Sequence, residues 1–205
     1  YQAIKVGKHD GENAIINVLR FHEAPSALVF ANTRATVGRL TTRLSNRGFS
    51  VVCLSGELSQ AERSHALQAM RDGRARICVA TDVAARGIDL PKLDLVIHAE
   101  LPSNHERLLH RSGRTGRAGR KGTSVLIVPP TALRKAERVL KTAKLTALWG
   151  VAPTADEVLV KDHERILKDD VWTRNVNSVH EHMVPKLLEL YGAERVAAAF
   201  LETYT

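Results

Sequence analysis

Arginine and glycine alternate along residues 110–120 in a pattern that suits phosphate binding. The four arginines of this segment are Arg111, Arg114, Arg117 and Arg120. A guanidinium group can bind a phosphate through two parallel hydrogen bonds, and glycines let a loop wrap closely around an anion. The alternative is a solvated basic loop with no ligand. Because the segment falls at the predicted ligand-binding edge of a sheet, phosphate binding is the favoured interpretation.

A second segment, residues 79–89, directly follows an apolar run and carries further groups that suit a nucleotide or nucleic acid. Thr81 and Arg86 could bind a phosphate backbone, and Asp89 could accept a hydrogen bond from a ribose hydroxyl. Gly87 would let the backbone approach a ligand. In the alternative interpretation, Thr81 and Asp82 cap a short turn and Asp89 is a surface turn residue.

A third segment, residues 32–34, also follows an apolar run, but its Thr33 can equally cap the next helix. Short continuous apolar runs separated by helical stretches predict a parallel sheet covered by helices on both faces, an α/β fold. Ligands of such sheets bind at the carboxyl ends of the strands, where these three segments lie. The predicted strands are 27–31, 51–54, 77–80, 95–97 and 124–128.

Helical spacing predicts helices over 34–47, from a capping box at Ser59 and Glu62 to Gly73, and over the basic stretch 131–144. Pro153 marks a shift in composition. Two more capping boxes, at Thr154 and Ser178, open further helices, and a last helix follows Gly192. No strand is expected after Val128. The pattern predicts a first domain over 1–148 and a small all-helical extension over 149–205.

Positive charge is concentrated in the first part of the chain. The whole chain has a net charge of +8, and residues 1–130 alone carry 19 basic and 11 acidic residues. Residues 131–148 hold five bases against Glu137, whereas 149–205 hold six bases against ten acids. A polyanionic partner, such as a nucleic acid, is therefore expected to bind the first 148 residues. A solvated basic surface is the alternative.

The length of 205 residues and the 44% of hydrophobic residues suffice for one large domain or a domain with an appendage. No run is long enough to span a membrane, and the first ten residues do not resemble a secretory signal. They are typical of a cut between two domains. The two isolated cysteines, Cys53 and Cys78, predict reduced buried thiols and a cytoplasmic protein, with no disulfide and no metal site.

Taken in order, the segments NTR (32–34), VATDVAARGIDLP (79–91) and HRSGRTGRAGR (110–120) resemble motifs IV, V and VI of DEAD-box ATP-dependent RNA helicases. Gln60 and Arg63, between the first two, resemble a further conserved pair of that family. The resemblance covers residues 1 to about 130 and rests on three long motifs in register. It implies the C-terminal RecA-like domain of such an enzyme.

The resemblance implies a role for several residues. Arg114 and Arg117 would be catalytic arginine fingers at the ATP γ-phosphate, with Gly87 and Asp89 also binding ATP. His110 and Arg111 would link motif VI to the acidic motif of the partner domain. The residues implied to bind RNA are Gln60, Arg63, Thr81 and Arg86. The sequence departs from the common family pattern at Ser55, Leu108 and Ser112.

Two elements of an ATP site have no counterpart in the sequence. It contains no G-x-x-x-x-G-K-[ST] segment, and its only Asp-Glu pair, Asp156-Glu157, lies in a predicted helix-capping box. The cofactor is expected to be ATP with Mg²⁺, whose ligands would lie on an N-terminal RecA-like domain. The chain alone is therefore expected to be inactive. The competing classes are a non-enzymatic RNA-binding or dimerisation module and a DNA-directed helicase of the same superfamily.

The extension resembles that of Hera-type bacterial helicases, in which it forms a dimer. This implies a homodimer built through apolar residues, and the alternative is a tail that folds back on its own domain. We expect Trp149, Trp172 and His98 to be structural rather than ligand-binding. The predicted dimerisation residues are Met183, Leu187, Leu188, Tyr191, Val196, Phe200 and Leu201.

Overall fold

The structure, a computed structural model, describes residues 1–87, 93–116, 121–175 and 180–204. The chain divides into two units, Tyr1–Ala155 and Asp156–Thr205. Within the described ranges, none of the helices has the length and apolar character needed to cross a membrane.

The first unit is built on a sheet of seven strands in the order β3-β4-β2-β5-β6-β1-β7. Every pair of neighbouring strands is parallel. All residues of β2, β4 and β5 are buried, as continuous apolar strands of a doubly covered sheet should be. The strands are β1 (Gln2–Lys5), β2 (Ala27–Phe30), β3 (Val51–Leu54), β4 (Ile77–Ala80), β5 (Leu95–His98), β6 (Thr123–Val128) and β7 (Leu148–Val151).

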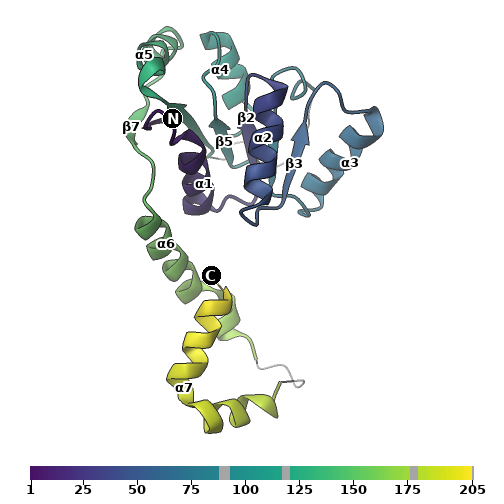
Figure 1. The fold of residues 1–205 in the computed structure, drawn as a ribbon, viewed down its shortest axis with the longest axis vertical. Coiled ribbons are helices and arrows are strands. Elements are labelled where there is room, and N and C mark those ends of the chain that lie inside the picture. The colour runs from purple at the N-terminus through teal and green to yellow at the C-terminus, as the bar shows by residue number, and fades with distance from the viewer. Residues whose placement is uncertain (88–92, 117–120, 176–179, 205) are drawn as a thin grey trace. The chain divides into compact units, whose positions relative to one another are not determined.

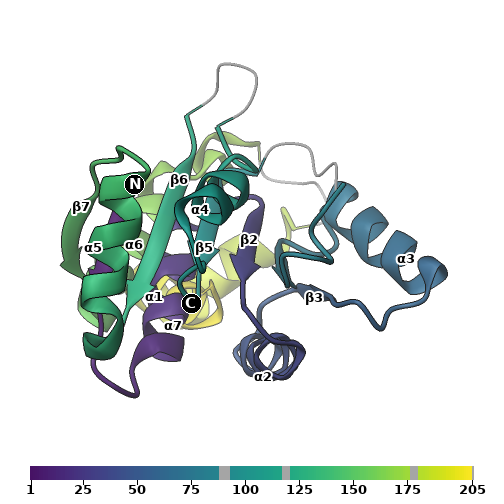
Figure 2. The ribbon, with the colours of Figure 1, turned by 90° about the horizontal axis from the view of Figure 1, so that it is seen from above.

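Helices cover both faces of this sheet, which confirms the predicted fold class. Helices α1 (Gly11–His22) and α2 (Arg34–Ser45) bury their apolar sides in one core and lie next to each other in Figure 1. The opposite face carries α3 (Gln60–Arg71), α4 (His105–Ser112) and α5 (Leu133–Thr142) over two further clusters. Figure 2 shows the same unit from above.

The helix starts follow the chemistry of their capping residues. The Thr33 hydroxyl accepts a hydrogen bond from the Thr36 amide, so Thr33 does cap α2. The predicted capping box at the start of α3 is complete, with Ser59 and Glu62 each accepting from the other's backbone. These local bonds fix where α2 and α3 begin, directly after the strands that carry the site.

Four elements differ from the sequence prediction. Strand β1 and helices α1 and α4 were not predicted, and β7 lies after Val128, where no strand is expected. Strand β7 pairs with β1, with Trp149 in register with Ala3. The expected domain boundary after residue 148 falls inside β7, and the first unit extends to Ala155. All four β7 residues are exposed, so the strand has no alternating pattern that the sequence could reveal.

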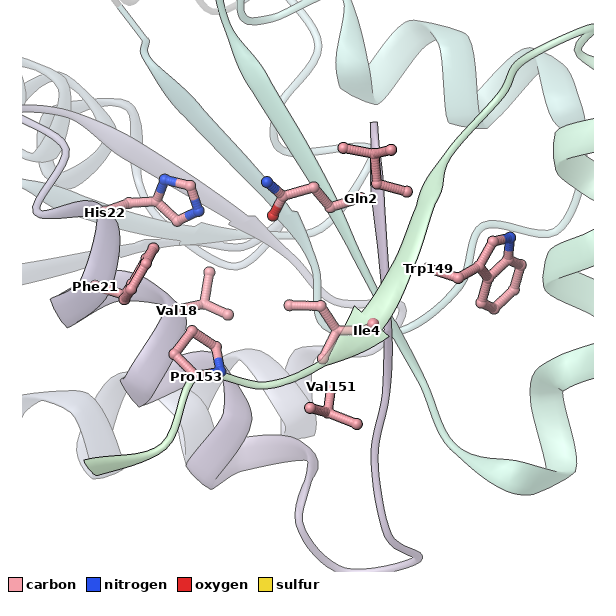
Figure 3. A pocket seen from close by; sticks show the side chains of 10 residues that line it. Gln2, Ile4, Val18, Phe21, His22, Trp149, Val151 and Pro153 are labelled. Carbon is pink, nitrogen blue, oxygen red and sulfur yellow. The ribbon is translucent and has the colours of Figure 1, made fainter. Parts of the chain in front are cut away.

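A pocket of about 200 Å³ lies between β7, β1 and the last turns of α1. Figure 3 shows Phe21, His22 and Pro153 on one side of β7 and Trp149 on the other. Near this pocket the Asn17 side-chain amide donates to the carbonyl oxygen of Pro153, one of the lining residues, at 2.8 Å. This bond ties the segment that follows β7 to α1.

The second unit is helical, with α6 (Ala155–Lys168), a short 3₁₀ turn (Asp170–Thr173) and α7 (Met183–Tyr204). Gly192 has a left-handed φ of 74° that kinks α7 between the two helices predicted there. The expected cap Ser178 lies outside the described residues. The Trp172 indole donates to the Ile166 carbonyl oxygen and meets the Phe200 ring edge-on at 5.4 Å.

A buried polar triangle joins β5, β6 and α4. His98 Nε2 lies 3.0 Å from Ser124 Oγ and 3.3 Å from Ser112 Oγ, and the two hydroxyls are 2.9 Å apart. The His98 side chain is fully buried, as the expected structural role requires. Burial, reinforced by the positive charge of Arg111, lowers the pKa of His98 to about 3. Ser112, a departure from the common family pattern, thus has two polar partners.

Acidification should therefore destabilise the chain through His98. Its pKa in the folded state lies below the unfolded value near 6.5, so the unfolded state binds more protons between about pH 6.5 and pH 3. Stability should fall by up to about 2 kcal/mol from pH 7 to pH 5. Urea unfolding at both pH values measures this loss. The His98→Gln variant cannot titrate and should show a flatter dependence; an equal slope would contradict the assignment.

Candidate functional site

The three sequence segments meet at the carboxyl edge of the sheet. Strands β4, β2 and β5 are neighbours and parallel, so the residues that follow them lie side by side. Asn32 follows β2, Thr81 and Asp82 follow β4, and Glu100 follows β5. The predicted convergence of the segments at 32–34 and 79–89 is confirmed for their described residues, 32–34 and 79–87.

Arg111 joins these strand ends. Its Nε and Nη2 donate to the two carboxylate oxygens of Asp82 at 2.6 and 2.8 Å. Nη2 also donates to Asn32 Oδ1 at 2.8 Å, and Nη1 donates to the Glu100 carbonyl oxygen at 2.8 Å. One guanidinium therefore bonds to residues that lie after three different strands.

The surroundings of Arg111 are those of a structural residue. Its side chain is 0% exposed, and the guanidinium carbon lies 5.1 Å from the centre of the Phe30 ring. The sequence pattern predicts a contact from Arg111 to a partner domain. In the structure the guanidinium instead forms hydrogen bonds within its own unit, because Arg111 lies in the last turn of α4, next to the ends of the strands. His110, one residue earlier, is exposed.

Asp82 is the charged partner that makes this burial possible. Burial alone would raise the pKa of its carboxyl, but the hydrogen bonds and charge of Arg111, with smaller contributions from Arg107 and His110, outweigh it. The pKa therefore lies below its ordinary value and Asp82 is ionised at neutral pH. From the sequence, Asp82 was expected at most to cap a turn; the matching arginine, 29 positions away, could not be identified.

Glu100 organises the segment at 32–34. Its carboxylate accepts from the Asn32 amide nitrogen at 2.6 Å, and the Asn32 side-chain amide donates to the Leu101 carbonyl oxygen at 3.3 Å. Asn32 is thus held from both sides while its Oδ1 meets Arg111. Sequence reasoning missed Glu100, and no local signal marks it.

The residues expected to bind RNA form a second group beside this network. Gln60 and Arg63 lie in the first turn of α3, and Arg63 Nη2 donates to the Arg86 carbonyl oxygen at 3.1 Å. The Thr81 hydroxyl accepts from the Ala84 amide at 3.4 Å, so Thr81 also shapes the turn, as the alternative interpretation holds. Gln60 and Arg86 are exposed. The group presents cations and polar atoms on one surface.

The arginine-rich segment begins as helix and continues as a loop. His110, Arg111 and Ser112 form the last turn of α4, which ends before Gly113. Arg114 Nη2 lies 3.0 Å from His110 Nε2, so the implied finger and the implied interdomain histidine are in contact. Asp89 and Arg117 lie outside the described residues.

Two close contacts shape the loop that carries Arg114. The Thr115 hydroxyl donates to the Leu93 carbonyl oxygen at 2.5 Å. A Cβ on Gly122 would lie 2.1 Å from Thr115 Oγ1 and 2.5 Å from the Gly116 nitrogen, so only glycine fits there. Gly116 and Gly87 have left-handed φ values of 68°. These glycines permit backbone shapes that place the neighbouring arginines.

The described residues include no group of three or more His, Cys, Asp or Glu side chains that could hold a metal ion. The cations and hydrogen-bond donors of the site suit anions. The chemistry available at this edge is therefore phosphate binding and charge stabilisation.

Comparison with known proteins agrees with this assignment. The family model described as the helicase conserved C-terminal domain matches residues 11–119. The chain is 35% identical over 188 residues to the DEAD-box ATP-dependent RNA helicase CshA of Geobacillus kaustophilus, covering 89% of this chain and 40% of that protein. It is 51% identical over 100 residues to the mitochondrial DEAD-box ATP-dependent RNA helicase 9 of Arabidopsis thaliana, covering 49% of this chain and 16% of that protein.

Solved structures show the same fold. The DEAD-box protein SrmB of E. coli, bound to a regulator of ribonuclease activity, aligns with a TM-score of 0.70 at 32% identity, covering 77% of this chain and 91% of that chain. S. cerevisiae Dbp5 bound to RNA and ADP BeF3 aligns with a TM-score of 0.70 at 28% identity, covering 82% of this chain and 44% of that chain. The present chain thus spans less than half of the full-length relatives named above.

Loss of the Arg111 guanidinium should destabilise the first unit strongly. Arg111→Ala leaves the Asp82 carboxylate without its main partner, and removing one member of a buried ion pair costs about 3–5 kcal/mol. Arg107→Ala is the matched control: Arg107 lies 3.8 Å from the same carboxylate but is 55% exposed, so its loss should cost less than about 1 kcal/mol. Urea unfolding would contradict a central role if both variants behaved alike.

Proposed function

Because the chain belongs to the DEAD-box RNA helicases, as the C-terminal RecA-like domain of such an enzyme, we propose that it forms one wall of an ATP site and one half of an RNA-binding surface. The observation that carries this proposal is the set of hydrogen bonds through which Arg111 joins three strand ends. The complete enzyme would couple ATP hydrolysis to the unwinding of RNA duplexes.

At the ATP wall, Arg114 and Arg117 act as arginine fingers on the γ-phosphate. Phosphoryl transfer depends on positioning and on stabilising charge that develops in the transition state. Gly87 and Asp89 hold the nucleotide. ATP enters with Mg²⁺, whose ligands belong to the N-terminal RecA-like domain, since the sequence has neither a phosphate-binding loop with its lysine nor a suitable acidic pair. The likeness to a relative solved with RNA and ADP BeF3 supports this assignment.

At the RNA surface, Gln60, Arg63, Thr81 and Arg86 contact the phosphate backbone. The hydrogen bond from Arg63 to the Arg86 carbonyl holds the two arginine-bearing elements together. Contacts to phosphates and 2′-hydroxyls read the shape of RNA with little preference for sequence. The site therefore suits RNAs of unrelated sequence.

The two surfaces share one connection. Thr81, on the RNA side, directly precedes Asp82, and Arg114, on the ATP side, follows Arg111 by less than a turn of chain. The ion pair between Asp82 and Arg111, with 2.6 Å between Nε and Oδ1, thus links the two surfaces. In this proposal His110, which is exposed beside Arg114, meets the acidic motif of the partner domain. Arg111 acts by positioning these residues.

Two other functions remain as alternatives, each with a discriminating test. A non-enzymatic RNA-binding or dimerisation module would show no ATPase activity even as the complete protein. A DNA-directed helicase of the same superfamily would be stimulated by DNA rather than RNA. Membership of the family favours neither alternative, since the relatives described above are RNA helicases.

The second unit serves as a dimerisation module in our proposal. Among its described residues only Val158 and Ile166 are buried apolar side chains, whereas Met183, Leu188 and Tyr191 are 51%, 45% and 54% exposed. A small unit that leaves so many large apolar side chains in water gains by covering them. A second copy presents the same surface and can satisfy it through twofold symmetry.

We also propose a cytoplasmic location. Cys53 and Cys78 are free thiols, and burial raises the pKa of the Cys78 thiol well above its ordinary value. Unreactive free thiols are typical of a reducing compartment.

The arginine fingers can be tested in the complete enzyme. Arg114→Ala and Arg117→Ala should each lower kcat by about 100-fold or more, with a smaller change in KM for ATP, because a finger acts in the transition state. Arg74→Ala, a change at an exposed arginine paired with Asp72, is the control and should leave kcat unchanged. The 205-residue chain alone should show no turnover. RNA-stimulated turnover that survives both finger substitutions would refute the roles.

Dimerisation can be tested on the chain itself. Sedimentation equilibrium should give twice the monomer mass of 22.6 kDa at micromolar concentration. Leu188→Asp places a charge in the apolar stripe of α7 and should return the chain to monomer. Ala198→Asp introduces the same charge at an exposed α7 position away from the stripe and should leave the dimer intact. A wild-type monomer at high concentration would exclude the proposed dimer.

A further inference from the structure

Helix α5 has a strongly basic outer face to which the proposed function assigns no role. Ala136, Val139 and Leu140 point into the core and are buried, which leaves the charged residues on the outside. Arg134, Arg138 and Lys141 follow one another at helical spacing along that face. Lys135 and Lys144 flank them, and Glu137 is the one acid in residues 131–148.

These positive charges have little internal compensation, because Glu137 is the one acid among five bases. None of the five bases forms an ion pair with another described residue. The three arginines of α2, by contrast, are all paired: Arg39 and Arg43 share Glu12, and Arg34 pairs with Glu57. Like charges at this spacing repel one another along a helix. The line of cations on α5 therefore attracts an external polyanion more strongly than the paired arginines of α2 do.

The position of α5 connects this face to the site. The helix follows β6 and so starts at the carboxyl edge of the sheet, where Lys135 Nζ donates to the Leu101 carbonyl oxygen at 3.4 Å. The same carbonyl accepts from Asn32. From there α5 runs away from the edge for about 15 Å, given its ten residues. A strand that leaves the site along this edge, past β2 and β5 toward β6, would reach the basic line of α5.

A further cation lies on the same side of the sheet. Lys5 Nζ stands 5.6 Å from the centre of the Trp149 ring. Trp149 is in register with Ala3, which packs in the cluster beneath α5. Trp149 is 39% exposed, and Leu148 and Val151 beside it are 75% and 76% exposed, so this apolar sheet edge lies outside the basic surface of α5.

The chemistry of this face favours nucleic acid over a protein or a membrane. No large apolar residue between 131 and 144 is exposed, although protein interfaces and membrane-surface helices depend on apolar anchors. Evenly spaced arginines and lysines without such anchors match a phosphate backbone. We propose that the outer face of α5, with Arg134, Arg138 and Lys141, together with Lys144 just after the helix, is a second RNA-backbone site, which rests on the proposed RNA-binding function and extends it beyond the motif residues.

The test compares two variants of the 205-residue chain that lose the same charge. One carries Arg134→Gln, Arg138→Gln and Lys141→Gln; the control carries Arg39→Gln and Arg43→Gln on α2 and Arg47→Gln in the turn that follows it. Fluorescence anisotropy measures binding of a labelled single-stranded RNA of about ten nucleotides and of the same strand extended by a hairpin duplex. Both RNAs are titrated over a range of salt concentrations.

The α5 variant should bind the extended RNA about tenfold more weakly at low salt, and the slope of log K against log[salt] should fall by about 2–3, one phosphate contact for each cation. Binding of the short strand should change less than about threefold, and the α2 control should change little for either RNA. RNA should also protect Lys141 and Lys144, but not Lys161, from acetylation.

Other results overturn the proposal. Equal losses in the α5 and α2 variants would show a general effect of net charge, and an unchanged α5 variant would exclude the site. Arg63→Ala with Arg86→Ala tests the motif surface separately and should weaken both RNAs. If these substitutions act and the α5 substitutions do not, only the α5 site fails. If the wild-type chain binds neither RNA, the RNA-binding function and the α5 site fail together.

Discussion

The buried ion pair between Arg111 and Asp82 is the interaction on which the site depends. A guanidinium that is 0% exposed is costly unless its donors are satisfied, and here they are satisfied by Asp82, Asn32 and the Glu100 carbonyl. A buried pair of this kind adds little net stability compared with an apolar pair. Its effect is to fix the relative positions of three strand ends, since moving any of them would leave a buried charged or polar group without its partner.

That constraint explains how one edge of a sheet can present two surfaces at once. Three neighbouring parallel strands bring the segments together, and Arg111 sets their spacing. Arg63 bonds to the Arg86 carbonyl at the surface that we propose for RNA, while Arg114 lies beside His110 at the surface that we propose for ATP. Phosphate groups are the common chemistry of both ligands, so arginine recurs in both surfaces.

The distribution of charge along the chain matches this preference for phosphate. The arginines of α2 form ion pairs within the first unit, whereas the cations on the outer face of α5 are available to solvent or ligand. The second unit has the opposite character, with a net acidic composition and large exposed apolar side chains such as Tyr191. The first unit is thus suited to polyanions and the second to a partner with matching apolar surface.

The sequence by itself determined the strands β2 to β6, the caps at Thr33 and Ser59, and which segments are candidates for phosphate binding. Each of these depends on apolar runs, hydrogen bonds or motif spacing within a few residues. Arg63, Arg86 and Arg114 could be selected on this basis, because a motif in register specifies residue types. The roles implied for Asp89 and Arg117 rest on the sequence motifs alone.

Only the tertiary structure decided that Arg111 is buried rather than exposed, that Ser112 joins His98 and Ser124, and that β7 completes the sheet beside β1. Each of these depends on residues that are distant in sequence: Asp82 lies 29 positions from Arg111, and Trp149 pairs with Ala3. A local pattern cannot show which side chains meet across a sheet. Burial, which sets the charge state of His98 and the role of Arg111, exists only after the strands have assembled.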